Sequence, residues 1–212
     1  GGNAVADVLL GKKVPSGKLT DSWAMDYSDY PSAQTFSFKS GDVFHEEYKE
    51  GIYVGYRYFD TFDVPVRYGF GFGLSYTTFS ISSPNVTLTG VGTENPTLTA
   101  EVEVTNTGEQ YSGKEVVQVY VSCPQQGLPK EYRRLAGFAK TKELSPKETQ
   151  KLTISFPLYQ LSSYDESSAS WILDGGNYGI WIGNSLQDAE LCAVMELDGQ
   201  AVLVSGTNIC KP

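Results

Sequence analysis

The sequence predicts a mainly β protein built around one antiparallel β-sandwich. Three observations support this prediction: short segments that alternate apolar and polar residues, turn signals between those segments, and no good helix among them. The alternation is clearest in residues 97–105, where Leu98, Ala100, Val102 and Val104 are expected on one face of a strand. Seven such segments at this spacing are typical of a sandwich of roughly 100 to 120 residues.

The predicted strands lie between residues 97 and 197, and turn signals rich in proline, glycine or asparagine separate most of them. Residues 116–121 (VVQVYV) are the most apolar and are therefore expected at the centre of a sheet. Residues 201–204 are also apolar, and they are either a last edge strand or the start of a connection to further sequence. The seven predicted strands are 97–105, 116–121, 135–140, 149–156, 171–173, 178–182 and 191–197.

The first 76 residues have a different character. Residues 4–10 form an apolar run that predicts a helix of about two turns, closed by Gly11. Residues 12–19 form a turn-rich connector, and residues 20–47 carry scattered aromatic rings without a sustained helical or strand period. Because rings without a regular element have nothing to be buried against, we expect this segment to lie across something larger.

Aromatic residues and glycines crowd the run from Tyr48 to Phe79, which we call the aromatic run. Dense glycines let one backbone approach another or take positive φ, while the rings between them fill volume. The favoured interpretation is a packed, loop-rich seam between domains. The alternative is an aromatic surface that binds sugar.

Composition excludes several classes of protein. Hydrophobic residues make up 40% of the 212 residues and charged residues 19%, as in a folded soluble protein. The formal net charge of −9 argues against nucleic acid as a partner. No apolar run reaches the roughly 18 residues that a membrane span needs, and no secretory signal peptide is evident, so no membrane partner is expected.

The three cysteines are far apart, with no CxxC pair and no histidine nearby, which argues against a zinc site. Three free, buried thiols are the favoured expectation, and one disulfide, such as Cys192 with Cys210, is the alternative. The sequon at Asn85 is weak evidence of secretion, so the compartment, cytoplasmic or secreted, stays open. The chain begins Gly1-Gly2-Asn3 instead of with methionine, which favours processing, a trimmed chain or a fragment.

Several stretches, in order along the chain, resemble the C-terminal half of glycoside hydrolase family 3, the family of β-glucosidases and their relatives. Residues 1–19 (GGNAVADVLLGKKVPSGKL) are similar to the segment that ends the family's α/β sandwich domain, and residues 48–60 (YKEGIYVGYRYFD) and 68–79 (YGFGFGLSYTTF) to the aromatic segments that close it. The stretches that resemble the following fibronectin type III-like domain are VTNTGEQYSGKEVVQVYVS, EYRRLAGFAK, LSPKETQKLTISF and WILDGGNYGIWIGNS.

The resemblance implies a division into three parts. Residues 1–76 would be the C-terminal part of the α/β sandwich domain, residues 77–197 an immunoglobulin-like or fibronectin type III-like β-sandwich, and residues 198–212 a tail or linker. It also implies a parent enzyme that hydrolyses terminal β-D-glucosides with retention of configuration. Its partners would be the remaining α/β sandwich and (β/α)8 barrel domains, in the same chain or another.

The catalytic groups of that family are expected elsewhere. Retaining hydrolysis needs two carboxyl groups about 5 Å apart, and in the family these come from the barrel and from an earlier loop of the sandwich domain. Nothing in this chain resembles the SDW-type or GEGxDR-type segments that carry them. We therefore expect no catalytic, cofactor-binding or metal-binding residues here, no cofactor, and no activity from this chain alone.

Some residues in the aromatic run and before it invite a catalytic or metal interpretation. His45 and its neighbours Glu46, Glu47 and Glu50 are interpreted as a solvated charged patch instead. The carboxyl groups of Asp60 and Asp63 are expected to cap turns or to pair with Arg57 or Arg67, and Arg57 is expected to be structural.

Candidates in the predicted sandwich have structural interpretations as well. Residues 131–134 (EYRR) are interpreted as an exposed mixed-charge loop, with contact to a partner domain as the alternative. Trp171 and Trp181 are expected to pack in the core, with a sugar-binding platform as the alternative. Cys123 is expected to be a small buried residue and not a nucleophile.

Three hypotheses for function follow. The first is a structural C-terminal portion of a family 3 enzyme that supports the catalytic domains. The second is a free-standing carbohydrate-binding or adhesion module, which saturable binding of cello-oligosaccharides would distinguish. The third is a subunit that completes a split glycosidase, which restored hydrolysis on mixing with a barrel-bearing chain would reveal.

Overall fold

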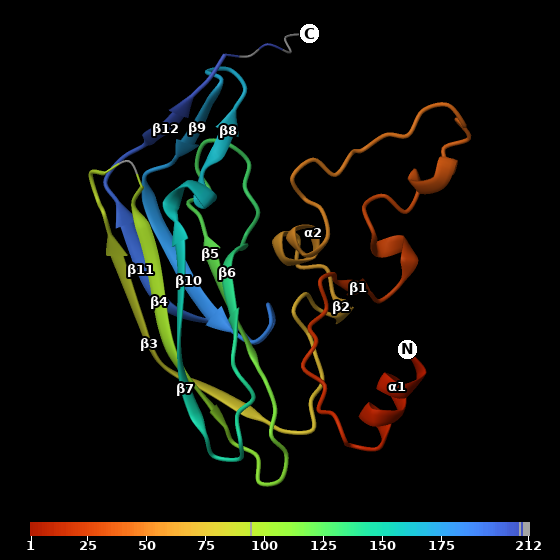
Figure 1. Cartoon of the computed structure of the whole chain (residues 1–212). Helices are drawn as coiled ribbons and strands as arrows, with labels where there is room; N and C mark the ends of the chain where they lie inside the picture. Colours follow the sequence, from red (N-terminus) through yellow and green to blue (C-terminus); the bar gives the residue numbers. More distant parts are fainter. Residues whose placement is uncertain (94, 208, 210–212) are drawn as a thin grey trace.

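The computed structural model describes residues 1–93, 95–207 and 209 of the chain. Two antiparallel sheets face each other, and the residues before β3 lie along one side of them (Figure 1). The first sheet has the strand order β3 (Phe79–Thr89), β4 (Thr97–Asn106), β7 (Thr149–Pro157). The second has the order β11 (Glu190–Leu197), β10 (Gly176–Gly183), β5 (Val116–Ser122), β6 (Arg134–Lys140). The predicted fold class is confirmed.

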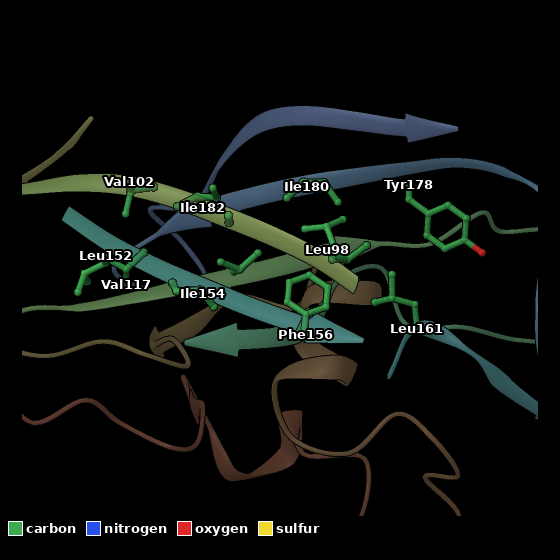
Figure 2. Packing of buried hydrophobic residues seen from close by; sticks show 14 of the residues in the cluster. Leu98, Val102, Val117, Leu152, Ile154, Phe156, Leu161, Tyr178, Ile180 and Ile182 are labelled. Carbon is green, nitrogen blue, oxygen red and sulfur yellow. The ribbon is translucent and has the colours of Figure 1, made fainter. Parts of the chain in front are cut away.

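The main core fills the space between these two sheets (Figure 2). In β4, the predicted alternation places Leu98, Ala100, Val102 and Val104 in the core with at most 1% of their surface exposed. Side chains of β5, β7 and β10 supply most of the remaining core residues. The residues of β5 are buried on both faces, because the main core covers one face and residues of the aromatic run cover the other. This agrees with its apolar sequence.

A third, smaller sheet lies at one end of the sandwich and has the order β12 (Ala201–Ser205), β9 (Ser170–Leu173), β8 (Ser163–Asp165) (Figure 1). The short 3-10 helix η3 (Leu158–Leu161) leads from β7 into it. All seven predicted strands are therefore present as β4, β5, β6, β7, β9, β10 and β11. Residues 201–204 take the edge-strand alternative, within β12.

The long strand β3 was not predicted, and its sequence explains why. Pro84 cannot donate a hydrogen bond to a ladder, and Ser83 has a φ of 52°. The pairing of β3 with β4 shifts its register between Ser82 and Asn85, so the alternation is broken halfway. An edge strand tolerates such a bulge, which a pattern of alternating residues does not reveal.

The N-terminal region contains little regular structure. Helix α1 (Gly2–Leu9) confirms the predicted helix, and Gly11 follows it with a φ of 70°. The two-residue strand β1 (Trp23–Ala24) pairs with β2 (Val66–Tyr68), and the 3-10 helices η1 (Tyr27–Asp29) and η2 (Phe36–Phe38) lie between them in the chain. Helix α2 (Tyr56–Thr61) was not predicted, because six residues rich in aromatics show no helical period.

No helix within residues 1–93, 95–207 and 209 is long and apolar enough to cross a membrane.

The cysteines differ from the prediction of three buried thiols. Cys123 is buried and free as predicted, but Cys192 is free and exposed on β11, so the prediction of burial is wrong there. Cys210 lies outside the described residues.

These two thiols should react at very different rates. Burial raises the pKa of Cys123 to about 11, so at pH 8 almost none of it is the nucleophilic thiolate, and the core covers it. We expect an aromatic disulfide reagent at pH 8 to modify Cys192 in the native chain and Cys123 only after unfolding. Peptide mapping by mass spectrometry identifies the modified residue, with Cys192→Ser as the control. Rapid labelling of Cys123 in the native chain would contradict its burial.

Candidate functional site at the seam between the aromatic run and the sandwich

The outer face of the β10–β5–β6 sheet and the loops beside it contact Tyr56, Asp60, Thr61, Phe70 and Gly71 of the aromatic run, and we call this contact the seam. Figure 1 shows α2 standing beside β5 and β6. At its centre, Tyr120 of β5 is fully buried and points away from the main core, toward Tyr56 and Phe70. The ring centroids of Tyr56 and Phe70 are 4.6 Å apart, and both lie within 6.5 Å of the Tyr120 ring. The favoured interpretation of the aromatic run as protein-packing rings therefore holds for these residues.

Backbone groups on both sides of the seam are also paired. The amide of Leu135 donates to the Tyr56 hydroxyl at 2.9 Å, and the amide of Tyr132 donates to the Thr61 hydroxyl at 2.9 Å. The amide of Leu186 donates to the Phe70 carbonyl at 3.0 Å. Unpaired buried backbone groups are costly, so these bonds fix the position of the run on the sheet.

A bidentate ion pair links α2 to the sandwich. Arg133 donates from Nε to Asp60 Oδ2 at 3.0 Å and from Nη2 to Asp60 Oδ1 at 2.5 Å, and both side chains are nearly buried. The guanidinium also donates to the Leu186 carbonyl at 3.1 Å and lies over the Trp181 ring, 5.1 Å from its centroid. The expectation that Asp60 caps a turn or pairs with Arg57 or Arg67 is wrong, because Arg133 engages both of the Asp60 carboxylate oxygens.

Glu131 is the second charged centre of the seam. Its carboxylate accepts from Arg134 Nε at 2.6 Å and Nη2 at 3.2 Å, and the Nε of Arg57 in α2 lies 3.6 Å away. Burial raises the pKa of Glu131, but the hydrogen bonds and positive charge of Arg134, helped by Arg57, outweigh it and hold this pKa below its usual value. The interpretation of residues 131–134 as an exposed loop is wrong for Glu131, which is 3% exposed, although Tyr132 is 42% exposed. Contact with another part of the protein, the alternative, is present as contact with α2. Arg57 is structural, as predicted.

One glycine of the aromatic run is required by the close approach of the two parts. Gly71 has a φ of 81°, and a Cβ atom there would lie 2.4 Å from Gln118 Oε1 on β5. Gln118 itself is buried and accepts a hydrogen bond of 2.5 Å from the Tyr120 hydroxyl. A side chain at position 71 would therefore be strained at this φ and would force the Gln118 side chain to move.

Other rings of the N-terminal region face away from the sandwich. Trp23, Tyr68 and Phe72 stack in sequence, with centroid distances of 5.9 Å and 5.0 Å, and line an apolar hollow of about 500 Å³ with Leu74. Most of the large exposed apolar side chains of the described residues lie before residue 77, and Phe44 and Tyr48 are almost fully exposed. The region thus has one face on the sandwich and a second, uncovered apolar face.

The remaining candidates do not assemble into a catalytic or metal site. His45 is exposed and contacts Asp42, with 2.8 Å between Nδ1 and Oδ2, and Lys49 pairs with Glu47, as expected for a solvated patch. Asp63 is exposed, and the neighbouring Asp60 is occupied by Arg133. The residues that the structure describes contain no group of three His, Cys, Asp or Glu side chains that could hold a metal ion.

The tryptophans correct another prediction. Trp181 packs with Leu186 and Tyr120 in the small cluster at the seam, and its Nε1 donates to the Ser122 hydroxyl at 3.0 Å. Trp171 is outside both clusters and only partly buried, so the prediction that it belongs to the core is wrong.

Two models of known protein families match parts of this chain. Residues 1–56 match the Glycosyl hydrolase family 3 C-terminal domain, and residues 115–186 match the Fibronectin type III-like domain. The chain belongs to glycoside hydrolase family 3. It corresponds to the C-terminal portion of that family's β-glucosidases.

Individual relatives agree. A β-glucosidase of Ruminococcus albus is 43% identical over 96% of this chain and 21% of its own length. An exo-alpha-(1->6)-L-arabinopyranosidase of Bifidobacterium longum is 37% identical over 94% of this chain and 25% of its own. The crystal structure of a β-glucosidase from Paenibacillus barengoltzii superposes with a TM-score of 0.90 at 42% identity, covering 96% of this chain and 23% of that one. The chain therefore spans about a fifth to a quarter of the family 3 relatives it matches.

Proposed function

We propose that this chain is the structural support of a family 3 enzyme that hydrolyses terminal β-D-glucosides with retention of configuration. The catalytic carboxyl groups would come from the (β/α)8 barrel and the remaining α/β sandwich domain. The parent's substrate is inferred from the relatives, most of which are β-glucosidases, although an arabinopyranosidase is among them. The chain's own task is to hold the end of the α/β sandwich domain in place.

The two-faced N-terminal region carries this proposal. One face is tied to the sandwich by buried ion pairs and backbone hydrogen bonds, which is far more than a flexible tether needs. The opposite face leaves Trp23, Leu74 and other apolar side chains uncovered. Exposed apolar surface of this kind marks a protein interface, and the occupant we propose is the rest of the α/β sandwich domain.

The experiment is complementation in trans. Residues 1–212 alone should release no nitrophenol from an aryl β-glucoside, and measurable turnover would contradict the proposal. The partner chain is the Ruminococcus albus β-glucosidase truncated to remove its matching portion. We expect hydrolysis to return when the two chains are co-expressed, and to be much weaker with Asp60→Asn than with the matched control Asp63→Asn. Equal restoration by both variants would mean that the seam does not support catalysis.

A further inference from the structure

A cleft of about 1060 Å³ opens between the start of the aromatic run and the end of the sandwich that carries β8 and β9. The side chains of Tyr53, Tyr164 and Trp171 contribute aromatic surface to it. Glu50, Gln160 and Glu166 contribute polar groups. Its size is that of a site for a ligand of several rings.

The aromatic surface is built by strand register. Trp171 on β9 is paired with Tyr164 on β8 and with Val204 on β12, so the three residues form a row across the small sheet. Directly paired residues point to the same face of a sheet. The rings of Tyr164 and Tyr159 each lie 5.4 Å from that of Trp171, and these tyrosines are 40% and 43% exposed. The row is therefore a continuous apolar strip that the chain leaves open to solvent.

The polar side chains of the cleft are free to form hydrogen bonds with a ligand. Among the described residues, no hydrogen bond or ion pair engages the side chains of Glu50, Gln160 or Glu166. Of the positive groups that line the cleft, Lys49 pairs with Glu47, whereas Arg57 and Arg134 share the single carboxylate of Glu131. When Glu47, Glu131, Glu50 and Glu166 are counted against the three cations, the charge around the cleft is −1, and the net charge of the chain is −9.

We propose that this cleft binds a neutral carbohydrate chain. A pyranose ring offers an apolar face of C–H groups, which packs on an aromatic ring, and a rim of hydroxyl groups, which needs planar polar partners. Trp171 and Tyr164 supply the stacking surface, and Gln160, Glu50 and Glu166 supply hydrogen-bond partners. The unpaired carboxylates of Glu50 and Glu166 and the negative charge of the chain disfavour acidic polysaccharides.

The test is calorimetric titration of the whole chain, residues 1–212, with cellopentaose, laminaripentaose and xylopentaose, and with polygalacturonate as the acidic arm. We expect saturable binding of at least one neutral chain and none of polygalacturonate. Trp171→Ala should weaken that binding about tenfold or more, as for other buried aromatic contacts. Trp181→Phe is the matched control, because Trp181 lies at the seam, and it should bind like the parent chain.

Tyr164→Ala and Glu166→Gln test the same cleft in case Trp171→Ala loses binding only because it misfolds. Both positions are partly or fully exposed, so these variants should fold normally and still bind more weakly. Unchanged affinity in all three cleft variants would overturn the proposal. So would preferential binding of polygalacturonate, or the absence of binding to every neutral chain. The titration measures binding and the complementation experiment measures hydrolysis, so failure of one proposal can be distinguished from failure of the other.

Discussion

Replacing Asp60 with asparagine is expected to open the seam while the sandwich stays folded. Asp60 and Arg133 are 10% and 12% exposed in their side chains, so the substitution leaves a nearly buried guanidinium without its counter-ion. Removing one partner of a buried ion pair costs about 3–5 kcal/mol. Arg133 keeps its hydrogen bond to the Leu186 carbonyl and its contact with the Trp181 ring. We therefore expect a cost at the lower end of this range, about 3 kcal/mol.

Hydrogen exchange measures this opening directly. The amides of Leu135 and Leu186 are hydrogen-bonded across the seam, so their exchange should accelerate roughly 100-fold, the factor that about 3 kcal/mol implies. Amides of β4, which pair within the first sheet, should keep their protection. The control is Asp63→Asn, the same chemical change three residues later at an exposed position where asparagine suits the φ of 51°. Equal exchange in both variants would mean that the ion pair does not hold the seam.

Most strands could be predicted because the alternation of apolar and polar residues within a strand indicates which face is buried. The alternation of Leu98, Ala100, Val102 and Val104 reports the face of β4 that meets the core, whatever its partner strands are. Strand β3 escaped because Pro84 and the bulge at Ser83 interrupt that signal. Local pattern therefore identified β4, whose alternation is unbroken, and missed β3.

The seam was harder to predict in detail because its partners are far apart in sequence. The density of rings and glycines indicated a packed seam, but not that Asp60 meets Arg133, 73 residues away. The near neighbours Arg57 and Arg67 looked like the natural partners of Asp60, and only the tertiary fold decides otherwise. The half-buried position of Trp171 depends in the same way on β8, which is three residues long and has no pattern of its own.

Glu131→Gln is expected to lower the stability of the chain at neutral pH and to change its response to acid. The Glu131 side chain is 2% exposed and binds Arg134, so neutralising it leaves a guanidinium that is mostly buried without a counter-charge. The expected loss in the free energy of unfolding at pH 7 is about 3 kcal/mol. The partly exposed Glu148, which pairs with the exposed Lys142 and accepts from the Ser145 amide, provides the control. Glutamine can keep the bond to that amide, so Glu148→Gln should have a much smaller effect.

The pH dependence gives the sharper test. The pKa of Glu131 is lower in the folded chain than its ordinary value of 4.5, so the unfolded chain binds this proton first as the pH falls. The stability that Glu131 contributes is therefore complete above pH 4.5 and is lost as the pH falls through the folded pKa below it. Urea unfolding at pH 7, 5, 4 and 3 should show the parent chain approaching Glu131→Gln toward pH 3, whereas the two differ fully at pH 7 and 5. A difference that stays constant down to pH 3 would mean that the charge of Glu131 contributes nothing, and that the substitution acts through shape alone.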